Sequence, residues 1–168
     1  MKDHGVPVEG VIDSAVEVTV KLKPTRLGLI GGRRTVVSGV YRRAFAAHNM
    51  TVHQRIAQPL SGLIESGDIS SEDLRHEARR ILTPIRNSSH ILLACTHYPA
   101  IEPLLKELVS PTTQFIDPAG ALLKKIARWR LQLGGDDIFV TTGDAAAMKR
   151  ASTAAFGVRI TNANKVRL

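Results

Sequence analysis

The chain alternates regularly between short apolar runs and longer amphipathic stretches, and this alternation constrains the fold more than any other feature. The apolar runs predict β-strands at residues 6–12, 26–30, 52–57, 90–94, 114–116 and 138–142. The amphipathic stretches predict helices at residues 15–22, 35–48, 58–65, 71–87, 98–109, 119–131 and 144–156. Such alternation predicts an α/β fold with a mainly parallel sheet flanked by helices. The polar residues 161–168 are predicted to form a loose tail.

The composition agrees with a layered core of this kind. Hydrophobic residues make up 43% of the 168 residues, but aromatic residues make up only 4%. The core must therefore consist of Val, Ile, Leu and Ala, which suit a sheet buried between helices. A chain of this length supports one ordinary domain, or one domain and part of another.

Neither a membrane span nor a disulfide is predicted. No apolar run approaches the ~20 residues that a transmembrane helix needs, and residues 1–5 carry no apolar signal region. Cys95 is the only cysteine, which excludes an internal disulfide and suits a reducing compartment. We therefore expect a soluble, cytoplasmic protein with no membrane partner.

The net charge of +8 raises the question of nucleic-acid binding. The basic residues are dispersed over several predicted helices, and no nucleic-acid-binding motif accompanies them. The few aromatic residues are too sparse for a base-stacking platform. We therefore expect no specific nucleic-acid partner, and only weak, salt-sensitive attraction to polyanions.

Cys95 is the leading candidate for chemistry because of its place in the sequence. It follows the apolar run at 91–94 and precedes Thr96, His97 and, after Tyr98, a proline, which is typical of a buried strand that turns sharply into a helix. Open α/β folds bind ligands at the carboxyl ends of their strands, and a helix N-terminus favours a thiolate. Thr96 offers a hydroxyl and a backbone N–H to a carboxylate. Cys95 can equally be a small buried hydrophobic residue, and the residues alone leave both interpretations open.

The neighbouring candidates also have structural alternatives. His97 suits proton handling better than metal binding, because no second ligand stands at a useful spacing, so we expect no metal. The turn at Gly31 and Gly32 lacks the glycine patterns of dinucleotide-binding and P-loop sites, so it does not predict a nucleotide. Glu65 ends an apolar helix and, taken alone, is a surface acid at a helix C-terminus.

Taken together and in order, five segments resemble the glutamate racemase family of cofactor-independent amino-acid racemases, within the wider Asp/Glu racemase group. The most specific is Cys-Thr-His-Tyr-Pro at 95–99 after its hydrophobic strand. The others are the strand, turn and helix at 28–41, the apolar segment with its acid at 59–67, and the blocks at 116–119 and 139–144. The resemblance covers residues 6–157 and implies two α/β lobes that face each other across the site.

The resemblance implies a two-base reaction that interconverts L- and D-glutamate without a cofactor. One thiolate removes the α-proton from one face, and a second cysteine, as a thiol, protonates the other face. Cys95 corresponds to the base that serves the L-enantiomer, and Thr96 to a substrate-binding residue. The family supplies D-glutamate for peptidoglycan synthesis, and its members are commonly dimers.

The resemblance also assigns roles to four residues around this cysteine. His97 would assist proton handling, and Glu65 would orient it. Thr35 corresponds to a polar residue that lines the pocket. Gly32 stands at the pocket rim where many family members have Thr, so a hydroxyl is missing there.

One departure from the family pattern is larger. Nothing before residue 6 resembles the opening segment that carries the first catalytic cysteine. On the family plan, residues 1–117 form the second lobe and residues 118–160 form part of the first. That arrangement would expose apolar side chains, namely Ala121, Leu122, Ile126, Ile138 and Val140.

These points define the expected function and its alternatives. We expect the isolated chain to racemise glutamate poorly or not at all, and to need a homodimer partner or a complementary N-terminal lobe. One alternative is a non-catalytic module that binds carboxylates or a protein partner. Another is a racemase of aspartate or a different acidic amino acid.

Overall fold

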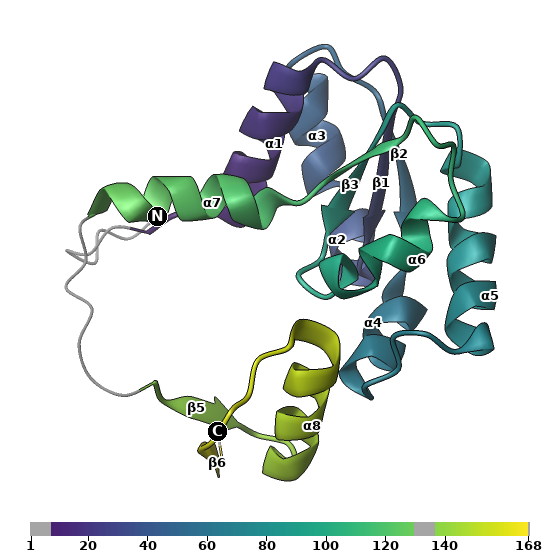
Figure 1. The fold of residues 1–168 in the computed structure, drawn as a ribbon. Helices are drawn as coiled ribbons and strands as arrows, with labels where there is room; N and C mark the ends of the chain where they lie inside the picture. Colours follow the sequence, from purple (N-terminus) through teal and green to yellow (C-terminus); the bar gives the residue numbers. More distant parts are fainter. Residues whose placement is uncertain (1–7, 130–136, 168) are drawn as a thin grey trace.

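A four-stranded parallel sheet forms the centre of the protein (Figure 1). The computed structural model describes residues 8–129 and 137–167. The strand order is β2-β1-β3-β4, and the strands are β1 (Leu27–Gly31), β2 (Val52–Ile56), β3 (His90–Ala94) and β4 (Gln114–Ile116). The predicted α/β class with a mainly parallel sheet is confirmed.

Helices cover both faces of this sheet because side chains alternate along each central strand. On one face, Ile30 and Leu93 pack with α4 (Gln58–Glu65), α5 (Glu72–Leu82) and α6 (Glu102–Lys106). On the other face, Leu29 and Leu92 pack with α1 (Val11–Leu22) and α3 (Val40–Ala46). These four side chains are fully buried. We call this layered part, with the helix α7 (Pro118–Ile126) that lies along α1, the sheet unit.

The position of Gly28 in β1 depends on the absence of a side chain. A Cβ atom there would lie 3.0 Å from Ser88 Oγ and 3.2 Å from side-chain carbons of Ile85 and Ile91. Glycine lets the segment that precedes β3 approach β1 this closely. That approach keeps β1 buried along its whole length.

The prediction of a strand at residues 6–12 is wrong. Residues 6 and 7 lie outside the described residues, residues 8–10 have no regular structure, and α1 begins at Val11. The side chains of Ala15, Val16 and Thr19 are buried. Together with Ile12, these residues form one face of a helix. Burial of this face determines the structure here, rather than the local alternation of valines that suggested a strand.

A single glycine divides the helix that was predicted at 35–48. The structure has two short helices instead, α2 (Arg33–Ser38) and α3. Gly39 lies between them with φ of +67°, a left-handed conformation that glycine adopts readily and that ends a helix. The change of direction lets α3 bury Tyr41 and Phe45.

Three other predicted helices are shorter than expected. The helix predicted to reach residue 87 ends as α5 at Leu82, and a 3₁₀ turn (Thr83–Ile85) that contains Pro84 follows. The helix predicted at 98–109 consists of a 3₁₀ turn, η2 (Tyr98–Ile101), followed by the short helix α6. The helix predicted at 119–131 is α7 followed by a 3₁₀ turn, and residues 130 and 131 lie outside the described residues.

The remaining described elements form a small second layer, which we call the C-terminal unit. Its parallel strands β5 (Phe139–Thr141) and β6 (Ala163–Lys165) flank the helix α8 (Ala145–Phe156) in sequence. The prediction of a loose tail at 161–168 is therefore wrong for β6, which gains its order by pairing with β5. In Figure 1, α8 lies beside α4, and it contacts both α4 and η2.

The predicted exposure of apolar side chains near residues 118–140 is confirmed only in part. Ile138 is 80% exposed and Val140 is 53% exposed. Ala121, Leu122 and Ile126 are half-buried, because α7 packs along α1. Within residues 8–129 and 137–167, no helix is both long enough and apolar enough to cross a bilayer.

Candidate active site

The carboxyl ends of the central strands bring three loops to one edge of the sheet. Gly31, the last residue of β1, pairs with Ile56 on one side and with Ala94 on the other. The turns that begin at Gly32, Ala57 and Cys95 therefore leave the sheet at the same level. This edge is where open α/β sheets bind their ligands.

Cys95 is half-buried and has polar neighbours on two sides. Its Sγ lies 3.3 Å from Nδ1 of His97 and 3.6 Å from Oγ of Ser61. The side chain also packs against the apolar cluster beneath it. The packing agrees with a small hydrophobic residue, whereas the two polar contacts agree with a reactive thiol.

His97 connects the thiol to a carboxylate. Its Nε2 lies 3.3 Å from Oε1 of Glu65. When Nε2, which faces the Glu65 carboxylate, carries the proton, a neutral imidazole presents the lone pair of Nδ1 to the sulfur of Cys95. In this tautomer His97 can accept the thiol proton. Glu65 stabilises the imidazolium that results, which is the general pattern of an activated nucleophile or base.

Gly32, Thr35 and Thr96 belong to the turns at this edge and the helix that leaves it. Thr96 is exposed, and Thr35 is half-buried in α2, where its carbonyl accepts a hydrogen bond from Ser38 Oγ at 2.9 Å. Gly32 precedes α2, and a Cβ atom there would lie 3.1 Å from Oε1 of Gln58. That oxygen accepts a hydrogen bond from the backbone N–H of Arg33. The structure thus joins Cys95, His97 and Glu65 by direct contacts, but it does not join the other three predicted residues to them.

Two residues that the sequence interpretation missed complete the surroundings of the sulfur. Ser61 is 4% exposed, and its Oγ lies 3.5 Å from the hydroxyl of Tyr98. The Tyr98 hydroxyl donates to the carbonyl oxygen of Ala57 at 3.0 Å. Burial raises the pKa of Tyr98, so this phenol stays protonated. A signal for Ser61 exists in the sequence, because Ser61 and Glu65 are four positions apart on one helix and therefore share a face.

The expected helix after Cys95 is a 3₁₀ turn, with His97 as its first flanking residue. A short turn of this kind has a smaller dipole than a full helix, so the side chains in contact with the sulfur matter more than a helix N-terminus does here. Phe156 of α8 lies near the imidazole of His97, with 6.3 Å between the ring centroids and an angle of 52° between the rings. Glu65 and His97 form one wall of a groove of about 490 Å³, and residues of β5, α8 and the turns beside them form the other.

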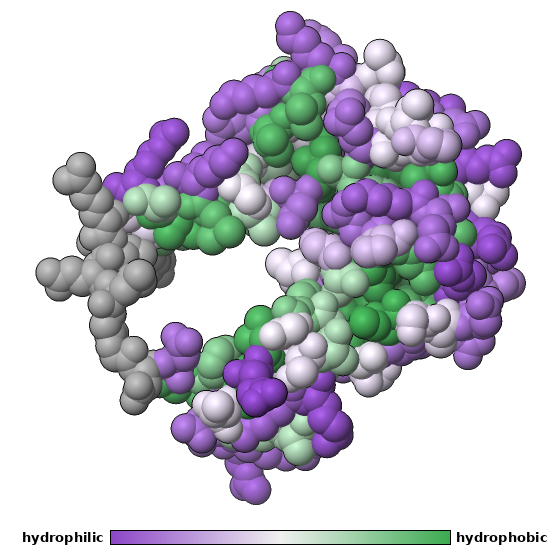
Figure 2. All heavy atoms as spheres, in the orientation of Figure 1, coloured by the Kyte–Doolittle hydropathy of each residue, from purple (hydrophilic) through white to green (hydrophobic). Residues whose placement is uncertain are grey.

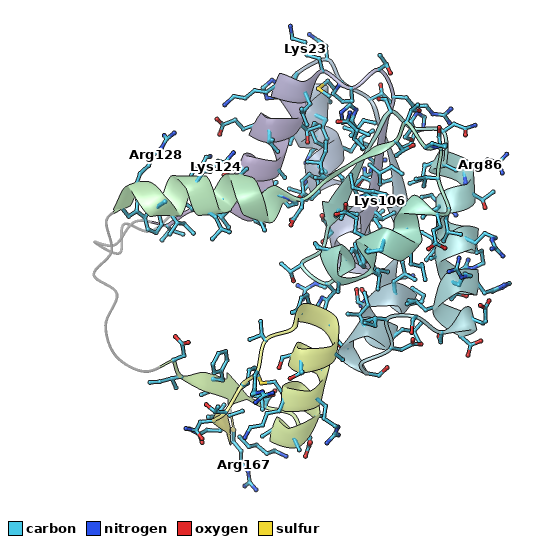
Figure 3. All side chains as sticks on the ribbon, in the orientation of Figure 1. Lys23, Arg86, Lys106, Lys124, Arg128 and Arg167 are labelled. Carbon is cyan, nitrogen blue, oxygen red and sulfur yellow. The ribbon has the colours of Figure 1, made fainter. Side chains whose placement is uncertain are left out.

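The described residues contain no cluster of three His, Cys, Asp or Glu side chains that could hold a metal ion. Basic side chains surround the molecule. Figure 3 shows Lys23, Arg86, Arg128 and Arg167 at its periphery, on separate parts of the chain. This distribution agrees with charges that are spread over the surface.

Comparison with known proteins places the chain in a family. The sequence model of the family described as Asp/Glu/hydantoin racemase matches residues 2–126. The chain belongs to this family. The match includes Cys95, His97 and Glu65.

Two relatives illustrate how far the likeness extends. A glutamate racemase from a Synechococcus species is 36% identical over 126 residues, which are 73% of this chain and 46% of the relative. A glutamate racemase from Bacillus cereus is 30% identical over 180 residues, which include 99% of this chain and 67% of the relative. The chain therefore spans between about half and two thirds of the length of these relatives.

The fold agrees with the sequence match. A glutamate racemase isoform from Bacillus anthracis superposes with a TM-score of 0.85 at 23% identity. The superposition covers 99% of this chain and 67% of that structure. It includes the C-terminal unit as well as the sheet unit, so the whole described arrangement occurs in this family.

Proposed function

We propose that the protein contributes one half of the active site of a cofactor-independent amino-acid racemase that interconverts L- and D-glutamate. The observation that carries this proposal is the chain of contacts from Cys95 through His97 to Glu65 at the carboxyl edge of the sheet. The glutamate racemases among its relatives support glutamate as the substrate. The enzyme class is therefore an isomerase.

The proposed chemistry follows from which of these three side chains can donate a proton and which can accept one. His97 Nδ1 accepts the proton of the Cys95 thiol, and the thiolate then removes the α-proton of the substrate to give a carbanion and a new S–H bond. A second acid on the opposite face must donate a proton to the carbanion to complete the inversion. Thr96 and the α2 turn with Gly32 and Thr35 would hold the substrate carboxylates, whose negative charge increases in the transition state.

The second acid must come from another polypeptide segment, because Cys95 is the only cysteine of the sequence. The surfaces of the molecule support a partner. Figure 2 shows hydrophobic residues on α7 and on the C-terminal unit, on the sides that face the opening between them. On these elements, Leu123 of α7, Val140 of β5 and Ile138 just before β5 are each more than half exposed. We propose that a complementary racemase lobe, or a second copy of the chain, covers these surfaces.

The family relationship supports a place for this reaction in the cell. D-Glutamate is a component of peptidoglycan, so we propose a role in cell-wall biogenesis and maintenance of cell shape. Free glutamate and a reduced thiol are both available in the cytoplasm, which is the location that we propose.

Hydrogen exchange at the substrate tests the proposal directly. We expect the isolated chain, incubated with L-glutamate in heavy water, to exchange the α-proton slowly and with little inversion. Proton NMR measures the exchange, and chiral chromatography measures D-glutamate. Cys95→Ala should abolish the exchange, whereas Ser66→Ala, at an exposed position beyond the same helix, should not change it.

Two outcomes would contradict this assignment. Rapid formation of D-glutamate by the isolated chain would show that one thiol suffices. Faster exchange of L-aspartate than of L-glutamate would assign the site to a different acidic amino acid.

A further inference from the structure

We propose that Ser61 is a positioning residue for Cys95, and that its hydroxyl, a second polar contact of the sulfur besides His97, stabilises the thiolate. The inference rests on the proposed function, in which the Cys95 thiolate is a base. The observation behind it is a buried chain of three contacts, from Cys95 Sγ to Ser61 Oγ, to the Tyr98 hydroxyl and to the carbonyl oxygen of Ala57.

The chain has a defined direction when the thiol is neutral. Tyr98 donates its only hydroxyl proton to Ala57, so its oxygen is available as an acceptor. Ser61 donates to this oxygen across 3.5 Å, a long and therefore weak hydrogen bond. The oxygen of Ser61 can then accept a hydrogen bond from the Cys95 thiol.

The direction changes when His97 removes the thiol proton. The sulfur becomes an acceptor only, and the Ser61 hydroxyl can rotate from Tyr98 towards it. Hydrogen bonds to charged groups are stronger than those between neutral groups, so the rotation exchanges a weak bond for a stronger one. No proton leaves Ser61 or Tyr98 in this step, because the thiol proton passes to Nδ1 of His97.

The surroundings of Ser61 make this response effective. Ser61 is 4% exposed and Tyr98 is fully buried, so solvent does not compete for their hydroxyls. A hydrogen bond is electrostatically stronger in such a site than in water. The helix α4 thus supports the site twice, with Ser61 beside the sulfur and Glu65 beside the imidazole.

The single cysteine allows a direct test on the chain as it is. Iodoacetamide alkylates only the thiolate, so its rate against pH, followed by intact mass spectrometry, reports the thiolate fraction of Cys95 without a background from other thiols. We expect Ser61→Ala to lower the alkylation rate near neutral pH by about tenfold and to move the midpoint of the profile up by about one pH unit. Ser66→Ala is the matched control, because Ser66 donates to the carbonyl of Leu63 and is exposed.

A second variant should shift the midpoint of the alkylation profile in the opposite direction. Tyr98→Phe removes the acceptor that competes for the Ser61 hydroxyl, so the midpoint should move to lower pH even if the fold loses stability. In concentrated guanidinium all variants should share one profile, because the contacts are absent there. A purely structural role would move the profiles of Ser61→Ala and Tyr98→Phe in the same direction.

The outcomes separate this inference from the proposed function. An unchanged profile in Ser61→Ala, or an upward shift in Tyr98→Phe, would overturn the role of Ser61. Reduced alkylation in Ser61→Ala, together with a lack of α-proton exchange in the unmodified chain, would uphold the role of Ser61 and reject racemisation.

Discussion

The sheet unit and the C-terminal unit use similar elements but differ in what covers them. In the sheet unit, β1 lies between two strands and two helical layers, and all its residues are buried. In the C-terminal unit, β5 pairs with β6 in a two-stranded sheet, and Val140 at its centre is 53% exposed. Two strands rarely form an independently stable sheet, so the C-terminal unit depends on the contacts of α8 with the sheet unit.

The two units therefore differ in what they contribute to the molecule. The sheet unit has the apolar layers of a complete domain, and it carries Cys95, His97 and Glu65. The C-terminal unit supplies the opposite wall of the groove at His97, including Phe156. The groove thus has one wall from a well-buried unit and one wall from a more exposed unit.

The largest expected effect is a loss of stability on truncating a strand residue in the sheet unit. Leu29→Ala removes a fully buried side chain of β1 and should lower the free energy of unfolding by about 3 kcal/mol. Val140→Ala in β5 should lower it by less than about 0.5 kcal/mol, because the side chain is half exposed. Urea unfolding followed by circular dichroism measures both. Equal losses would show that the two units are covered to the same degree.

The same contrast explains how much of the fold the sequence predicts. The two central strands, β1 and β3, follow from their apolar runs, because burial on both faces leaves a continuous hydrophobic signal at residues such as Leu92. The strand β6 has no such signal, since its order comes from pairing with β5 rather than from burial. The division at Gly39 was missed because the residues on both sides have helical periodicity, and only the tertiary path requires the turn.

The residues of the candidate site also differ in how far the sequence predicts them. Cys95 and His97 were found from their position after a buried strand, Glu65 was found through the resemblance to a known family, and the structure places the three in contact. Ser61 was missed because a serine in an apolar helix has no chemical signature of its own. Its partners, Cys95 and Tyr98, become neighbours only when β3 and α4 pack together.

A glycine in each unit provides a sharper comparison of packing. Gly28→Ala in β1 should lower the free energy of unfolding by about 1–3 kcal/mol, because its Cβ would lie 3.0 Å from Ser88 Oγ in a closed core. Gly143→Ala, in the turn after β5, places its Cβ at an ordinary 3.5 Å from Thr141 Oγ1. It should change stability by less than about 0.5 kcal/mol.

Thermal unfolding of both glycine variants measures these differences. A large loss in Gly143→Ala would mean that the turn after β5 is packed as tightly as the sheet unit. A negligible loss in Gly28→Ala would mean that the segment before β3 can move away from β1.

The smallest expected effect on stability concerns the contact between α1 and α7, which attaches α7 to the sheet unit. Glu17 of α1 pairs with Lys21 on its own helix at 2.8 Å and with Lys125 of α7 at 2.9 Å. Hydrogen bonds from Lys21 and then Lys125 lower the pKa of Glu17 from 4.5 to about 2. Because the folded-state pKa is the lower one, this stabilisation is complete above pH 4.5 and is lost as the pH falls towards about 2.

Glu17→Gln should therefore flatten the decline of the thermal midpoint over this pH range, and the effect should be small because Glu17 is exposed and screened by solvent. High salt should reduce the difference between Glu17→Gln and the unmodified chain. Lys125→Gln tests the contact between the helices, and Lys21→Gln tests the contact within α1. If hydrogen exchange in α7 rises in Lys125→Gln but not in Lys21→Gln, Glu17 fastens α7 to the sheet unit. If neither variant changes exchange in α7, that helix is held by its apolar contacts with α1 alone.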